Sequence, residues 1–181
     1  MPPRKKKLYH FMSKIFNILS IDCDWVRSLK HQEDLLSFLI PILIDGKEIH
    51  LAYDHDKIYS LFPHGYEEYN LINVDHHHDY ICQEFQKTLV DEGSWLFHLS
   101  SVFKKKINYT WINNCDSQHM GSAYAKLAKE RLKSYTFDRN ISFIKPQTFD
   151  TIFICCSPPE DYNTPAGITT YKIIEGIVNG R

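Results

Sequence analysis

Short apolar runs that alternate with longer helical stretches are the feature that most constrains the fold of this chain. The runs are rich in β-branched and aromatic residues and span 15–21, 48–53, 69–74, 108–112 and 151–156. Strands separated by helical stretches are joined by crossovers, so they pair in parallel with helices packed on the sheet. We predict an α/β fold in which a mainly parallel sheet lies between two layers of helices.

The stretches between these runs show helical spacing. Leu35, Leu39 and Leu43 recur every four residues within 33–44, which predicts a helix that Pro41 kinks or shortens. Further helices are expected over 95–103, 121–135 and 168–178.

Size and composition indicate one domain. The chain has 181 residues, of which 43% are hydrophobic, enough for one hydrophobic core and short for two. We expect a tail over 1–14 and a single domain over 15–181.

The charge of the chain does not favour nucleic acid. The formal net charge is -1 and the basic run 4–7 lies in the tail, so no nucleic-acid partner is expected.

Cysteine usage and hydropathy bear on the compartment. The five cysteines are an odd number and include no Cys-x-x-Cys pair, which is typical of a reduced protein. No run approaches the roughly 18 continuous apolar residues of a membrane span. We predict a cytoplasmic protein without a membrane partner.

Acidic residues and histidines directly follow three of the apolar runs. Ligand sites of parallel sheets lie beyond the carboxyl ends of the strands. Asp22 and Asp24 follow the first run, and on an extended segment their carboxylates share one side and repel unless a cation neutralises them. His55 follows the run 48–53 in the same way.

The segment 75–79, Asp-His-His-His-Asp, gives the strongest signal. Alternation along an extended segment puts Asp75, His77 and Asp79 on one side and His76 and His78 on the other. Two carboxylates and an imidazole suit Mn²⁺ or a related divalent ion better than a structural zinc.

The three strand ends together supply four carboxylates and two imidazoles, a set that predicts a site for two Mn²⁺ ions. The candidate ligands are Asp22, Asp24, His55, Asp75, His77 and Asp79. Paired divalent ions activate water for attack on a carbon or phosphorus centre, so hydrolysis is the expected reaction.

These motifs resemble those of the arginase, or ureohydrolase, family. Asp54-His55 resembles the Asp-His of its first motif, residues 75–79 fill its Asp-x-His-x-Asp, and residues 20–24 fill its Ser-x-Asp-x-Asp. Here the last of these motifs comes first, and the chain is much shorter than an ordinary arginase. That combination resembles the peptide arginases, which convert arginine residues of ribosomally made precursor peptides to ornithine and release urea.

The resemblance covers roughly residues 15–165 and implies an arginase- or deacetylase-like fold with an arginine-containing precursor peptide as partner. It implies that Asp22 and Asp75 bridge the two ions. His55 and Asp79 would complete one ion, and His77 and Asp24 the other.

The resemblance also implies an anionic partner for the cationic guanidinium group and a proton shuttle. Glu160 follows the last predicted strand and is the best-placed anion, with an ordinary exposed loop glutamate as the alternative. The candidate proton shuttles are His78, Glu92, His98 and His119.

Other assignments stay open. The sequence Asp75-His76-His77 also matches the DHH-type phosphoesterases, which use paired Mn²⁺, although the chain is short for their second domain. Asp22 and Asp24 could serve a haloacid-dehalogenase-like phosphatase, and a metal-binding domain without catalysis is a further alternative. For an arginase-like enzyme, free arginine, agmatine, another guanidino compound or an acylated amine are alternative substrates.

Overall fold

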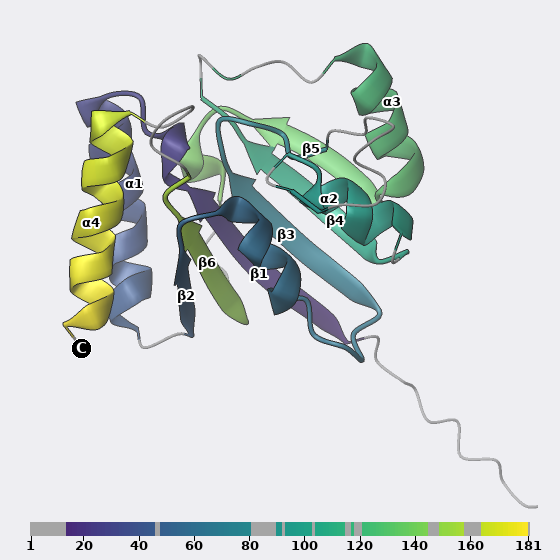
Figure 1. Ribbon diagram of the computed structural model, residues 1–181, viewed down its shortest axis with the longest axis horizontal. Coiled ribbons are helices and arrows are strands. Elements are labelled where there is room, and N and C mark those ends of the chain that lie inside the picture. The colour runs from purple at the N-terminus through teal and green to yellow at the C-terminus, as the bar shows by residue number, and fades with distance from the viewer. Residues whose placement is uncertain are drawn as a thin grey trace, which may run out of the picture.

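Six parallel strands form one sheet in the order β2-β6-β1-β3-β4-β5 (Figure 1). The strands are β1 (Ile15–Asp22), β2 (Ile49–Ala52), β3 (Glu68–Val74), β4 (Lys106–Ile112), β5 (Ser134–Asp138) and β6 (Thr151–Cys155). The computed structural model describes residues 14–45, 48–80, 90–91, 93–102, 104–114, 117, 121–144, 149–157 and 164–180. The predicted parallel α/β fold is confirmed.

Helical segments connect the strands. They are η1 (Cys23–Trp25), α1 (Leu29–Ile44), η2 (His55–Leu61), α2 (Trp95–Phe97), η4 (His98–Val102), α3 (Ser122–Arg131), η5 (Ile141–Phe143) and α4 (Pro165–Asn179). The predicted 168–178 helix begins earlier, at Pro165, because Thr164 Oγ1 accepts from the Gly167 amide at 3.0 Å and caps it.

Helix α1 is longer than its apolar spacing predicts and is not ended by its proline. It begins at Leu29 because Ser28 Oγ accepts from the His31 amide at 3.2 Å, which caps the first turn. Pro41 and Ser37 both lie on the exposed side of the helix. The Ser37 carbonyl, which loses its intrahelical donor to the proline, can therefore bond to water, and the helix continues to Ile44.

The single helix predicted over 121–135 is wrong at its C-terminal end. Helix α3 stops at Arg131, and the following residues form the edge strand β5. Tyr135 and Phe137 pair in register with Tyr109 and Trp111 of β4. Aromatic residues gain more from packing on a neighbouring strand than from extending an exposed helix, so tertiary pairing decides this segment.

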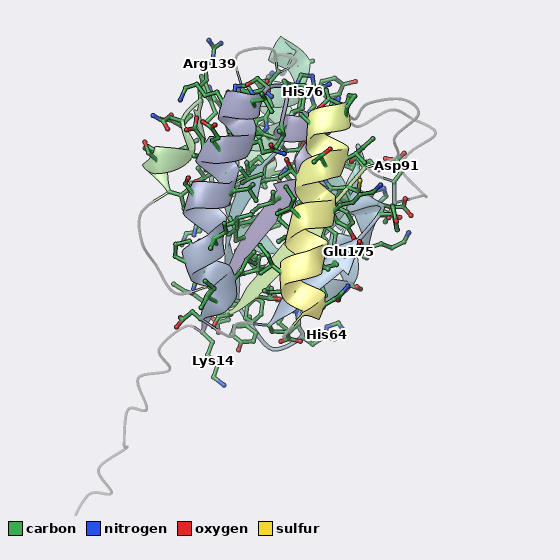
Figure 2. All side chains as sticks on the ribbon, turned by 90° about the vertical axis from the view of Figure 1, so that its left-hand side faces the viewer. Lys14, His64, His76, Asp91, Arg139 and Glu175 are labelled. Atoms are coloured by element: carbon green, nitrogen blue, oxygen red, sulfur yellow. The ribbon has the colours of Figure 1, made fainter. Side chains whose placement is uncertain are left out.

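The two faces of the sheet are buried in separate hydrophobic cores. Leu19 and Ile21 of β1 face α1 and α4, which lie side by side over that face (Figure 2). Ile18 and its neighbours on the other face pack against η2, α2, η4 and α3. This period of two along β1 explains the three layers, because each face must be covered to bury its apolar side chains.

The carboxyl ends of β1, β2, β3 and β6 lie next to one another at the same end of the sheet, because neighbouring parallel strands run in the same direction. Among the residues that the structure describes, no helix is both long enough and apolar enough to cross a membrane.

Candidate metal centre

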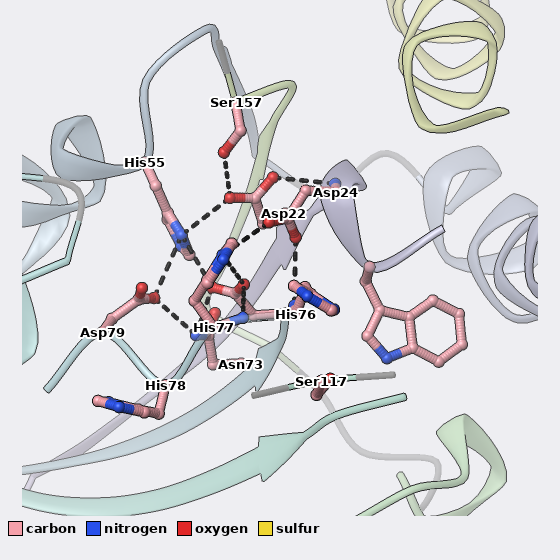
Figure 3. A network of polar contacts seen from close by, with 12 residues as sticks. Asp22, Asp24, His55, Asn73, His76, His77, His78, Asp79, Ser117 and Ser157 are labelled. Carbon is pink, nitrogen blue, oxygen red and sulfur yellow. Dashed lines mark hydrogen bonds and ion pairs between the residues drawn. The ribbon is translucent and has the colours of Figure 1, made fainter. Parts of the chain in front are cut away.

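Three strand ends bring six acidic and imidazole side chains together at the carboxyl edge of the sheet (Figure 3). The first end, after β1, carries its two aspartates at the start of η1; the second, after β2, carries its histidine at the start of η2; and the third is the segment after β3. All six candidate ligands predicted from the sequence lie in this cluster: Asp22, Asp24, His55, Asp75, His77 and Asp79.

The first part of the cluster, which we call the His55 half, comprises His55, Asp22, Asp79 and one oxygen of Asp75. The Nδ1 atom of His55 lies 3.3 Å from Asp22 Oδ2, 3.1 Å from Asp75 Oδ2 and 3.3 Å from Asp79 Oδ2. Each of these four residues is at most 3% exposed. An imidazole nitrogen facing three carboxylate oxygens is a ligand set for a divalent cation.

The second part, the His77 half, comprises His77, Asp24 and the other oxygen of Asp75. The Nδ1 atom of His77 lies 2.8 Å from Asp24 Oδ2 and 3.9 Å from Asp75 Oδ1. The His77 side chain is 25% exposed, whereas the Asp24 side chain is fully buried. The cluster is therefore open to solvent on the side of His77.

Asp75 belongs to both halves, because its Oδ2 faces His55 and its Oδ1 faces His77. One ligand atom from each of Asp24, Asp75 and His77 lies within 4.8 Å of the others, and the same holds for His55, Asp75 and Asp79. A carboxylate whose two oxygens face two ligand sets has the position of a bridging ligand between two ions.

The crowding of carboxylates perturbs the pKa values of Asp24, Asp75 and Asp79. Burial, followed by the charge of Asp22, raises the pKa of Asp24 well above its ordinary range. Burial and the charge of Asp75 do the same to the pKa of Asp79. Burial also acts to raise the pKa of Asp75, but its ion pair with His55 outweighs that effect and lowers the pKa. Two divalent cations would balance four ionised carboxylates.

The carboxylates in turn raise the pKa values of the two histidines. Burial alone would lower the pKa of His55, but the negative charges of Asp79 and Asp75 and the nearby Asp22 carboxylate outweigh it, and the pKa is raised well above its ordinary value. The pKa of His77 is also raised, because its close contact with the Asp24 carboxylate and the charge of Asp75 outweigh its burial. These shifts favour protons at the positions at which a cation would bind, and cation binding would displace them.

Two buried atoms of the cluster lack a hydrogen bond within the described part of the chain, although candidate metal ligands lie close to them. Among the described residues, neither His55 Nδ1 nor Asp24 Oδ2, both buried, has a partner with hydrogen-bond geometry, although candidate ligands lie within 3.3 Å of each. Most buried polar atoms in folded proteins are hydrogen-bonded, so each of these two atoms needs a partner of another kind. A divalent cation supplies that partner, and the donor set of carboxylates and imidazoles suits it.

Three neighbouring side chains hold the ligands in place. Ser20 Oγ lies 2.8 Å from His55 Nε2, and a hydrogen on Nε2 leaves the lone pair of Nδ1 for the cluster. Asn73 Nδ2 donates to Asp75 Oδ2 at 3.1 Å and to Asp79 Oδ2 at 3.0 Å. Ser157 Oγ donates to Asp22 Oδ2.

Sequence reasoning missed the roles of Asn73 and Ser157. Asn73 lies two residues before Asp75 on an extended strand and therefore points to the same side, so alternation could have revealed it. Ser157 is 135 residues from Asp22, and only the placement of β6 beside β1 brings the two together.

Backbone strain also concentrates at the cluster. Asp79 and Ser157 have φ values of 51° and 55°, in the left-handed region that side-chain-bearing residues seldom adopt. Each supplies an oxygen to the cluster. Strained residues persist where the surrounding structure holds them, and they gather at functional sites.

Unlike the candidate ligands, the candidate catalytic residues that the structure describes do not lie in the cluster. The His78 ring lies against Trp111 and Tyr124, and its Nδ1 accepts from the Tyr80 amide at 3.1 Å. Burial lowers its pKa to about 4, so the ring is neutral at pH 7, and it is turned away from the cluster (Figure 3). Its role as a proton shuttle stays a prediction. His98 is buried with its ring edge-on to Phe97. The other candidates lie outside the described residues: Glu92, His119 and Glu160.

Comparisons of the chain with models of protein families, with curated proteins and with solved structures found no match. The geometry of the cluster and the motifs that form it are therefore the features that bear on the function.

Proposed function

We propose that this protein is a hydrolase that uses two divalent cations, best supplied as Mn²⁺, at the cluster around Asp75. The observation that carries the proposal is the position of Asp75, which presents one oxygen to His55 and the other to His77. Two ions held by such a carboxylate lower the pKa of a water between them toward neutrality and polarise the group it attacks.

The residues of the cluster have distinct tasks in this proposal. The buried aspartates balance the charge of the cations, and Ser20 fixes the ring of His55 through Nε2. His77 is the ligand on the solvent side, so the electrophile approaches the centre past its ring. Asn73 keeps Asp75 and Asp79 oriented as the charge of the centre changes during reaction.

The substrate that we propose is the arginine side chain of a precursor peptide. The motifs after β1, β2 and β3 and their order along the chain resemble the peptide arginases, and this resemblance supports both the guanidino group and the peptide context. Water adds to the guanidinium carbon, the bond from that carbon to the chain nitrogen breaks, and the nitrogen takes a proton. The products are ornithine in the peptide and urea.

Two further assignments belong to the same proposal. Glu160 follows Ser157 by three residues in the sequence, and we assign to it the binding of the guanidinium cation. We place the enzyme in the cytoplasm, where the thiols of Cys23, Cys155 and Cys156 remain reduced.

The experiment that tests the proposal is mass spectrometry of peptides after incubation with the Mn²⁺-loaded protein. Synthetic peptides with one arginine in varied sequence contexts are compared with free arginine. We expect a loss of about 42 Da from the peptides, the mass difference between a guanidino group and an amine, with release of urea by a two-ion hydrolase. Loss from free arginine alone would contradict the peptide substrate.

Neighbouring histidines give a matched pair of variants. His77→Ala removes a candidate ligand, and we expect activity to fall at least about 100-fold. His76→Ala removes a ring that is bonded to Asn114 instead, at 3.3 Å, and should keep activity within about threefold. Bis-p-nitrophenyl phosphate is assayed in parallel. Its turnover without any change in the peptides would favour the DHH-type phosphoesterase instead.

A further inference from the structure

Cys155 ends β6 in the middle of the candidate centre. Strand β6 lies between β1 and β2, and Cys155 pairs in register with Asp22 on one side and with Ala52 on the other. Its side chain lies on the same face of the sheet as Phe153, which stacks on the His55 ring. The cysteine is completely buried. It is therefore placed between the strand ends that supply Asp22 and His55.

The sulfur of Cys155 is within reach of an ion in the His55 half. One ligand atom from each of Cys155, Asp22 and His55 lies within 4.8 Å of the other two. Ions such as Zn²⁺ bind sulfur at about 2.3 Å and imidazole nitrogen at about 2.0 Å, so the two ligand atoms of one ion lie at most about 4.3 Å apart, and a group within 4.8 Å reaches that separation by a small shift of its side chains.

The sulfur atoms of the other two buried cysteines of the described residues lie outside the groups of candidate ligands. Cys23 and Cys156 belong to the hydrophobic core beneath α1 and α4, on the opposite face of the sheet from Cys155. Cys156 follows Cys155 directly, so alternation along the strand turns the two thiols to opposite faces. Among the described residues, Cys155 is the cysteine whose sulfur lies in a group of candidate ligands.

The two halves of the centre thereby differ in the softness of their ligands. The His77 half offers carboxylate oxygens and one imidazole, which suit Mn²⁺. The His55 half offers an imidazole, carboxylates and a thiol, and thiolate ligands select softer ions such as Zn²⁺ and Co²⁺.

We propose that Cys155 is a ligand of the ion in the His55 half and makes the centre heterodinuclear, with Zn²⁺ or another thiophilic ion beside Mn²⁺. This inference rests on the proposed two-ion centre. On binding, the S–H bond breaks, the proton leaves to solvent and the thiolate donates an electron pair to the cation, so no oxidant or reductant is needed.

Titration of the metal-free, full-length protein with Co²⁺ tests the proposal through absorption. Cobalt bound by oxygen and nitrogen gives weak visible bands, and a sulfur ligand adds an intense charge-transfer band in the near ultraviolet. We expect the wild-type protein to show both kinds of band. Cys155→Ser should lose the near-ultraviolet band and keep the visible ones, whereas Cys156→Ser should keep both.

A competition experiment measures the same ligand through affinity. Cys155→Ser should weaken Zn²⁺ binding at least about 10-fold and change Mn²⁺ binding less than about threefold, because Mn²⁺ gains little from sulfur. If the serine variant does not fold, the same titrations of Cys155→Ala, which removes the sulfur without adding a hydroxyl to the buried site, decide the question in its place.

The outcomes separate this inference from the proposed function. Visible cobalt bands without a charge-transfer band in the wild type, or a band that persists in Cys155→Ser, would overturn the role of Cys155 and leave the centre itself standing. No cobalt absorption of either kind would overturn the two-ion centre, and with it both proposals.

Discussion

The two halves of the candidate centre share Asp75 but differ in exposure and in chemistry. His55 is 1% exposed and faces buried carboxylates at the carboxyl ends of the strands, whereas the His77 side chain is 25% exposed. Ions in buried sites exchange slowly with solvent, because every ligand around them is held by the fold. In the proposed function, the buried half would therefore retain its ion and the exposed half would meet the substrate.

Removal of the shared ligand gives the largest expected effect. Asp75→Ala should weaken the binding of both ions at least about 100-fold, because it takes one oxygen from each half. Isothermal titration with Mn²⁺ measures the affinity, and elemental analysis after desalting counts the ions. Retention of one tightly bound ion would break the comparison, since it would show that Asp75 does not bridge.

Substitution of each histidine should divide the centre. His55→Ala and His77→Ala should each lower the metal content from two ions to one, because each removes the imidazole of a single half. The ion that remains should differ in exchange rate. A chelator should remove the exposed ion left in His55→Ala faster than the buried ion left in His77→Ala. Equal rates in the two variants would contradict the assignment of a buried and an exposed half.

Loss of the hydroxyl beside His55 should affect only the buried half. Ser20→Ala removes the partner of His55 Nε2 and should weaken that half about 10-fold while leaving the other ion within about threefold. Stepwise metal titration resolves the two affinities. Ser60→Ala is a matched control, because its hydroxyl bonds to the Lys57 carbonyl on the exposed side of η2.

The pH dependence should give the smallest effect. The raised pKa values of Asp24, Asp79, His55 and His77 mean that the folded metal-free chain holds protons that the unfolded chain releases. Groups of this kind stabilise the fold below their unfolded pKa, and that stability is lost as pH rises through the folded value. The metal-free protein should therefore lose about 5 °C in Tm from pH 7 to about 8.5.

Other titrating groups leave this sign unchanged. The pKa of Asp75 is lowered, so its contribution is complete well below pH 7. The pKa values of His76 and His78 are lowered by burial, and both rings are neutral above pH 7 in the folded and the unfolded chain. Differential scanning fluorimetry with and without Mn²⁺ measures the effect. The increase in Tm on adding Mn²⁺ should become larger as the pH rises. An increase that becomes smaller would contradict the raised pKa values of the candidate ligands.

Several elements could be predicted from local patterns. The strands that became β1, β3 and β6 are apolar runs of the right length, and both halves of the ligand set follow such runs immediately. The end of α3 and the edge strand β5 could not be predicted in this way. Local propensity there is mixed, and pairing of Tyr135 with Tyr109 across the sheet decides the outcome.

The sequence by itself determined which side chains form the cluster, because alternation and the rule that parallel strands end on one edge depend only on neighbours in the chain. Only the tertiary structure decided how they divide. The order β2-β6-β1-β3 puts Cys155 and Ser157 next to Asp22, and it turns the two oxygens of Asp75 toward different histidines. That order depends on packing both faces of the sheet at once, which no segment of sequence specifies alone.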